Sequence, residues 1–424
     1  MEQNVNNSAA AARKHVPPRN SFGWNEWSGA FADLGISLPI LAALSFVSGF
    51  YTAQVLLLWG LVYIAVGWWF RVPVSVQPLK AMAVLTLVNE YVPVVLSAAA
   101  IVYGLLFVVL ARSGLIKHLN KLMRPALIRG VQLGIGLLLT VKAWDLAHEH
   151  GWLLQSEAPN WWLNTALLPA IVLLIWYVQF KRGFQLTPIL IGGAMLVALF
   201  NGAELPWGQA GGHTFSGPTS TLERLTDRLL GSGVDLGRHF QWQAAQTFEA
   251  VLLLIATQLP LTLGNAVYAA DETAHDLWPA RSGRVNPTSL AQSIGLANIG
   301  IGFLGGFPVC HGAGGMAAHA QFGARTGGAA IIVGAVFVVT ALVDPLLAAL
   351  LAIPVVVLAA LLLFDAVRMI NFVRRLDSKF EIFTACVIGL LSLLTKNLMI
   401  ALAAGGLLLF LQSRFRGARG TTPD

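Results

Sequence analysis

Two segments within apolar stretches of the chain combine residues that break a helix with residues that can bind an anion. The first is Pro73–Lys80, with the sequence PVSVQPLK, and the second is Phe307–Gly315, with the sequence FPVCHGAGG. Proline removes a backbone donor and disfavours helix at the residue before it, and clustered glycine leaves the backbone loose. We therefore expect each segment to enter as an extended strand and to start a short helix near Pro78 and near Gly312.

The start of a helix favours an anion, because free backbone N–H groups and the positive end of the helix dipole lie there. Two such starts that meet at membrane depth predict a site for a negatively charged ligand. Lys80 and His311 stand at the two breaks, and an ionisable side chain inside a membrane is a functional candidate because it is costly. The alternatives are that Lys80 extends to the membrane interface and that His311 only bonds a neighbouring helix.

Other polar residues also lie in apolar segments. A carboxylate at Asp33 could carry a coupled proton or cap its own helix, and both interpretations stay open. Glu249 lies near the end of its segment, which is more typical of a residue that faces water than of a coupling acid. Gln258, Thr262 and Asn265 follow at spacings of four and three residues, so one helix face carries all three. They either line a binding site or bond two packed helices.

The sequence has no arrangement typical of an enzyme, a metal site or a nucleotide site. His148–His150 has its two histidines on an expected outer loop, without the one-face spacing of a helical zinc site. Gly312–Gly315 lacks the Lys-Ser/Thr of a phosphate loop. Cys310 and Cys386 lie far apart, and no nucleophile has a plausible base. We expect no enzyme activity, no metal and no cofactor.

The elements that position these segments are expected to be membrane helices. Of 424 residues, 56% are hydrophobic and 11% are charged, and the mean hydropathy is +0.69; a soluble surface of this size is far more polar. Apolar stretches of about 20 residues follow one another from Ser28, which predicts an all-α membrane protein of about fourteen spans. The net charge of +7 is spread over short loops, so nucleic acid is not an expected partner.

The chain is expected to divide into two halves joined by a polar connector. An odd number of spans in the first half starts the second half from the other side of the membrane, which is the inverted-repeat plan of many secondary transporters. Lys and Arg, among them Arg368 and Arg375, concentrate in the loops that this count puts inside, so both termini are expected in the cytoplasm. The expected parts are a cytoplasmic tail (1–27), seven spans (28–200), an external connector (201–240), seven spans (241–413) and a short cytoplasmic tail (414–424).

The broken segments and their neighbours resemble the bacterial and plant molybdate transporters related to the SulP sulfate permeases. The matching stretches are Asp33–Ile40, Pro73–Lys80, Gly295–Asn298, Gly305–Gly315 and Phe322–Gly327. The resemblance implies seven plus seven inverted spans in a core and a gate domain, with half-helices in spans three and ten and a location in the plasma (inner) membrane. SulP permeases typically add a cytoplasmic STAS domain, and we expect none here because the sequence ends soon after the last span.

The resemblance also implies which residues hold the substrate. Carried over by position, these are Ser37, Gln77, Pro78, Leu79, Lys80, Thr262, Asn265, Cys310, His311, Gly312, Ala313 and Gly314. Relatives with this fold often place an acid where Asn265 stands. Proton coupling therefore stays open, with Asp33 and Glu249 as the candidate acids.

The leading hypothesis is a secondary active transporter for a tetrahedral oxyanion, molybdate first and sulfate second, that works by alternating access. A nucleobase or carboxylate transporter on the same fold is the alternative, although nucleobase sites usually use a carboxylate and neither break has one. A passive anion channel or a membrane sensor is a third hypothesis, but channels are lined more continuously with polar groups. The expected partners are the oxyanion, a coupled proton and membrane lipid, and a homodimer stays open.

Overall fold

The computed structural model describes residues 19–31, 37–38, 40–41, 43–44, 48, 50–119, 124–151, 161–177, 193, 244–351 and 353–419. Asp33, the expected connector and most of the expected seventh span lie outside these residues. The described chain is mostly helical, which confirms the predicted class. It contains five helices that are long and apolar enough to cross a membrane, or six if the bent pair Gly328–Leu342 and Asp344–Leu350 forms one span.

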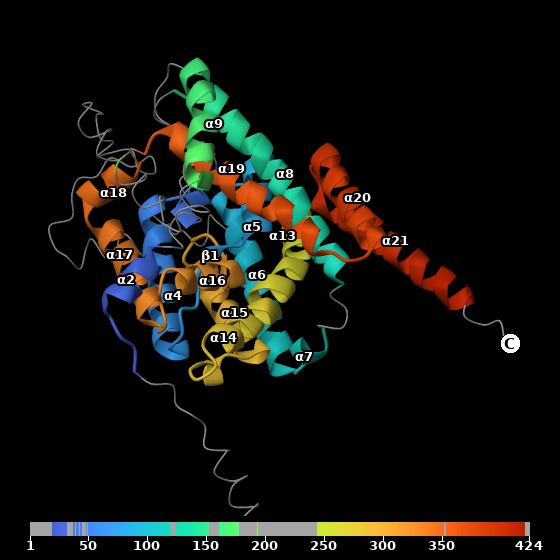
Figure 1. Cartoon of the computed structure of the whole chain (residues 1–424), viewed down its shortest axis with the longest axis horizontal. Helices are drawn as coiled ribbons and strands as arrows, with labels where there is room; N and C mark the ends of the chain where they lie inside the picture. Colours follow the sequence, from blue (N-terminus) through green and yellow to red (C-terminus); the bar gives the residue numbers. More distant parts are fainter. Residues whose placement is uncertain are drawn as a thin grey trace, which may run out of the picture.

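The helices of the two halves interleave in space (Figure 1). The first half contains α2 (Trp24–Ala30), α4 (Thr52–Phe70), α5 (Lys80–Asn89), α6 (Pro93–Arg112), α7 (Ile116–Leu119), α8 (Pro125–Glu149) and α9 (Trp161–Tyr177). The second contains α13 (Ala244–Leu261), η3 (Thr262–Tyr268), α14 (Ala269–Leu277), η4 (Ser282–Arg284), α15 (Pro287–Phe303), α16 (Ala313–Gln321), α17 (Gly328–Leu342), α18 (Asp344–Leu351), α19 (Val355–Asn371), η5 (Phe372–Arg375), α20 (Lys379–Thr395) and α21 (Leu398–Arg419). Proline at the first position starts α6, α8 and α15, where its missing N–H costs nothing.

The two broken segments meet as a short antiparallel pair of strands. Strand β1 (Gln77–Pro78) pairs with β2 (Val309–Cys310), with Gln77 opposite Cys310. Each strand is soon followed by a short helix, α5 from Lys80 and α16 from Ala313. The predicted sequence of strand, break and half-helix is thus confirmed in both segments, which are buried at the centre of the molecule.

Side chains bond backbone groups that have no strand partner in β2 and just before it. Asn298 of α15 donates from Nδ2 to the Val309 carbonyl at 2.8 Å and accepts the Val309 N–H at Oδ1, also at 2.8 Å. Trp59 of α4 donates to the Phe307 carbonyl at 2.7 Å. An unpaired backbone group would be costly in this apolar surrounding, so these side chains make the non-helical segment tolerable at membrane depth.

Two close helix pairs each join one helix from each half. Helix α4 packs on α17 and α6 packs on α15, and glycine lies at both crossings. A Cβ on Gly334 would lie 2.5 Å from the Gly60 carbonyl, and one on Gly104 would lie 2.6 Å from the Gly295 carbonyl. Small residues of this kind let helix backbones approach closely in membranes.

Replacing Gly295 with Ala is expected to lower the thermal stability of the purified protein. The new Cβ would lie 2.8 Å from the Gly104 carbonyl and 2.9 Å from the Val108 nitrogen, so α6 must move, at a cost of about 1–3 kcal/mol. Gly300→Ala in the same helix is the matched control, because nothing lies within 4 Å of its Cβ. Equal melting temperatures for the two variants would contradict the close crossing.

The outward faces of the helices carry apolar side chains. Trp68 is 66% exposed, Leu394 is 70% exposed and Leu173 is 64% exposed. Exposed apolar surface on this scale is not compatible with water and is typical of helices that contact lipid. The protein is therefore an integral membrane protein.

Candidate functional site

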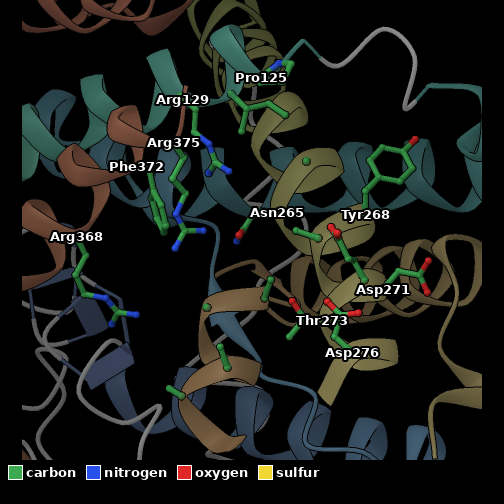
Figure 2. Close-up of a pocket in the computed structure, with 18 of the residues that line it drawn as sticks. Pro125, Arg129, Asn265, Tyr268, Asp271, Thr273, Asp276, Arg368, Phe372 and Arg375 are labelled. Carbon is green, nitrogen blue, oxygen red and sulfur yellow. The ribbon is translucent and has the colours of Figure 1, made fainter. Parts of the chain in front are cut away.

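A cavity of about 1090 Å³ lies between the start of α16 and the ends of α8 and α19. Figure 2 shows that side chains from α8, η3, α14, α19 and η5 surround it. The polar or charged residues in its wall are Lys117, Arg129, Asn265, Tyr268, Asp271, Glu272, Thr273, Asp276, Gln321, Arg368, Asn371 and Arg375. Of the predicted site residues, Asn265, Ala313 and Gly314 line this cavity.

The first turn of α16 presents free backbone donors to the cavity. The cap residue Gly312 makes no side-chain capping bond, and its carbonyl accepts the N–H groups of Gly315 and Met316 at 3.1 Å each. The N–H groups of Ala313 and Gly314 have no acceptor in the part of the chain that the structure describes. Because both residues line the cavity, these donors and the positive end of the helix dipole are available to an anion.

Arg368 of α19 faces the same helix start. A Cβ on Gly314 would lie 3.9 Å from Arg368 Nη2, and Arg368 also lines the cavity. Among the described residues no carboxylate lies within ion-pair distance of its guanidinium. The sequence marked Arg368 only as a loop residue that sets topology, so its place at the site was missed.

Side chains of the first broken segment pack over the start of α16. A Cβ on Gly312 would lie 2.5 Å from Gln77 Oε1, and one on Gly315 would lie 2.6 Å from Gln77 Nε2. Glycine is therefore required at both positions for the amide of Gln77 to pack there. Gln77 is buried and lies behind the helix start, and it does not line the cavity.

The start of α5 differs from that of α16, because a side chain already occupies its donors. Gln258 Oε1 accepts the N–H groups of Ala81 at 2.9 Å and Met82 at 3.3 Å, and Gln258 Nε2 donates to Thr262 Oγ1 at 3.0 Å. This corrects the expectation that both half-helices present free N–H groups. It also places Gln258 and Thr262 in a capping network.

Lys80, the first residue of α5, forms an ion pair with Asp365 of α19. Its Nζ lies 3.0 Å from Oδ1 and 2.9 Å from Oδ2, and the two side chains are 12% and 7% exposed. Lys80 therefore brings no uncompensated charge to the cavity in this conformation, and its contact with substrate stays a prediction. Asp365 was missed, although an acid inside the apolar stretch Val355–Asn371 follows the same rule that selected Lys80.

His311 and Cys310 are buried beside the strand pair. His311 bonds the Ser75 carbonyl through Nδ1 at 3.1 Å and Ser293 Oγ through Nε2 at 2.9 Å. Both ring nitrogens thus bond protein groups, which favours the alternative that this side chain joins neighbouring elements. Cys310 is buried and forms no disulfide. Neither residue lines the cavity, and neither Pro78 nor Leu79 does.

Thr262 and Asn265 both lie in a π-helix, which changes the angle between their side chains. Pro260 lies at the end of α13, and the chain continues as η3 over Thr262–Tyr268. A π-turn has more residues per turn than an α-helix and is frequent at functional sites. Residues that the α-helical spacing put on one face therefore diverge, so that Thr262 bonds Gln258 while Asn265 lines the cavity.

The cavity has one basic and one acidic wall. Arg129 and Arg375 lie over the ring of Phe372 at 5.1 Å and 5.0 Å from its centroid. Figure 2 shows these arginines on one side and Asp271 and Asp276 on the other. Because Arg368 lies at the helix start, the basic wall continues toward the free donors of α16.

The remaining predicted residues lie apart from this cavity. Ser37 is fully buried, and its Oγ has no hydrogen-bond partner among the residues that the structure describes. Glu249 is exposed on α13, as expected of a residue that faces water. Asp33 lies outside the described residues.

Sequence comparison shows that the chain is similar to molybdate transporters. Residues 25–139 and 250–369 match the family model described as "Molybdate transporter of MFS superfamily". Molybdate transporter 1 of Chlamydomonas reinhardtii is 29% identical over 458 residues, covering 86% of this chain and 87% of that protein. Molybdate transporter 1 of Arabidopsis thaliana is 27% identical over 403 residues, covering 90% and 87%.

Solved structures of other anion transporters share the fold. The transmembrane domain of the cyanobacterial bicarbonate transporter BicA has a TM-score of 0.66 at 18% identity, and the match covers 92% of this chain and 99% of that domain. The murine anion transporter Slc26a9 in the inward-facing state has a TM-score of 0.62 at 13% identity, covering 94% and 69%. At these identities the likeness extends to the fold alone.

Proposed function

Because the chain belongs to this family of molybdate transporters, we propose that it is a secondary active transporter of a tetrahedral oxyanion, with molybdate as the main substrate. Sulfate is the second candidate, because it has the same shape and charge. The relatives' names support molybdate, and the shared fold with other anion transporters supports anion transport in general.

The observation that carries this proposal is that free backbone donors lie beside a cation that no described carboxylate pairs with. The Ala313 and Gly314 N–H groups and the Arg368 guanidinium converge at the wall of the cavity. An oxyanion placed between them would accept two backbone hydrogen bonds and charge-assisted bonds from the guanidinium, whose fork suits an oxyanion. Asn265 adds an uncharged polar group on the η3 side.

The site is proposed to alternate between the two sides of the membrane. In this scheme α5 and α16 belong to a core domain, α8 and α19 belong to a gate domain, and the chain forms seven plus seven inverted spans. The pairing of α4 with α17 and of α6 with α15 supports the inversion, since exchanging the halves turns one pair into the other. The protein is proposed to lie in the plasma (inner) membrane with both termini in the cytoplasm. In this orientation the arginine-lined cavity opens to the cytoplasm.

Uptake into vesicles tests the proposal. Vesicles that contain the purified protein should accumulate labelled molybdate with saturable kinetics, and excess sulfate should compete while uracil should not. Empty vesicles are the control. A folded protein that moves no molybdate would overturn the assignment, competition by uracil would favour a nucleobase carrier, and flux that does not saturate would favour a channel.

A further inference from the structure

We propose that Asp365 carries the coupled proton of the transport cycle, and that its protonation frees Lys80 to share the charge of the bound oxyanion. The inference rests on the proposed oxyanion transport and adds to it the group that couples transport to protons. The two acids selected from the sequence, Asp33 and Glu249, are not needed for it.

One face of α19 contacts the starts of both half-helices. Asp365 holds the first residue of α5 through two contacts of 2.9 and 3.0 Å to Lys80. Arg368, three residues later and therefore on the same face, lies beside Gly314 in the first turn of α16. An anion at α16 therefore acts electrostatically on Asp365 across about one helix turn.

A count of charges explains why a proton would accompany the anion. Lys80, Arg368 and Asp365 together carry one net positive charge. A dianion beside them leaves one negative charge uncompensated, in surroundings where charge is costly. One proton on Asp365 removes that charge. The same proton ends the ion pair, so the Lys80 ammonium can turn to an oxygen of the substrate.

Few other charged groups face Asp365. Besides α5 and α16, whose starts contact Asp365 and Arg368, the described elements that pack on α19 are α8, α9 and η5. The part of α8 beside Ala366 is Gly136, whose Cβ would lie 2.8 Å from the Ala366 carbonyl. The titratable groups of α8, α9 and η5 lie nearer the ends of these helices. They are Arg129, Lys142, Asp145, His148 and Glu149 on α8, Tyr177 on α9, and Arg374 and Arg375 on η5.

The proton step is balanced within the cycle. A proton from water binds a carboxylate oxygen of Asp365, the contact to Lys80 opens, and Lys80 donates to the oxyanion instead. After the loaded site opens inward, the anion leaves, the proton returns to water and the ion pair forms again. The structure, with a closed ion pair and an open cavity, corresponds to the state after release.

The experiment measures molybdate affinity against pH with the full-length protein in nanodiscs. Between about pH 6 and about pH 8, wild-type affinity should rise by up to about tenfold for each unit of falling pH, the limit for one linked proton. Asp365→Asn keeps the shape but cannot take up a proton, so its affinity should not change with pH. Asp377→Asn, an acid removed from an exposed loop, is the matched control and should keep the wild-type slope.

Proton movement in wild-type vesicles is the second measurement, and it does not depend on any variant folding. Molybdate entry should acidify a trapped pH dye. The role of Asp365 would be overturned if wild-type affinity did not change with pH, or if molybdate entered without acidifying the dye. It would also be overturned if the pH dependence survived in Asp365→Asn or disappeared in Glu249→Gln. Each of these results would leave oxyanion transport intact. A wild-type protein that does not bind molybdate would overturn the proposed function itself.

Discussion

Replacing Arg368 with Gln should weaken molybdate binding by about ten- to a hundredfold. A hydrogen bond to a charged group contributes about 1.5–3 kcal/mol, and Arg368 is the cation nearest the free donors of α16. Glutamine keeps a polar side chain of similar reach, so loss of the charge dominates the effect. Equilibrium binding of labelled molybdate to the purified variant measures the change.

Arg374→Gln is the matched control for this prediction. Arg374 lies in η5, close to Arg368 in sequence, but it does not line the cavity. Its removal should leave molybdate affinity within about twofold of wild type, because exposed charges interact weakly through water and salt. If the two variants bind equally well, the anion does not lie at the start of α16.

The broken segments could be predicted because their causes are local. Pro78 and the glycines from Gly312 act on their own backbone, so strand, break and half-helix could be inferred from each stretch alone. The two breaks were expected to meet at membrane depth, but the antiparallel pairing of β1 with β2 was not predicted and is seen only in the structure. The sequence therefore predicted where the backbone leaves the helical form and which helix starts lie near one another.

The difference between the two half-helices could not be predicted, because it depends on contacts between distant parts of the chain. Lys80 and Asp365 are 285 positions apart, and Gln258 is 177 positions from the Ala81 N–H that it caps. Which side chain reaches a helix start depends on how α13 and α19 pack in three dimensions. Similarity of the two segments in sequence suggested two equal donors, whereas packing leaves only α16 free.

The charged groups of the site show a second limit of the sequence. A count of Lys and Arg by loop treats Arg368 and Arg375 as topology signals, and both line the cavity. A residue at the end of a span can serve both purposes, since a cavity that opens to one side of the membrane is lined by such ends. Only the position of α19 beside α16 identifies Arg368 as a cation of the site.

Replacing Asn298 with Leu should destabilise the strand pair more than any single change at the cavity wall. Leucine has a similar volume, but it leaves the Val309 N–H and carbonyl without the two 2.8 Å bonds that Asn298 provides. Each unpaired buried group costs about 1–3 kcal/mol, so the loss is about 2–6 kcal/mol. We expect a much lower melting temperature and little molybdate binding, measured by thermal unfolding and by equilibrium binding.

Asn89→Leu separates the loss of these backbone bonds from the loss of an asparagine as such. Asn89 donates only to the Leu85 carbonyl one turn earlier in α5, and it lies at the far end of that helix from the strands. Its replacement should change the melting temperature by a few degrees at most and should leave binding intact. If Asn298→Leu behaved like Asn89→Leu, β2 would hold its shape without Asn298. The start of α16 would then be positioned by the glycine contacts with Gln77, and not by α15.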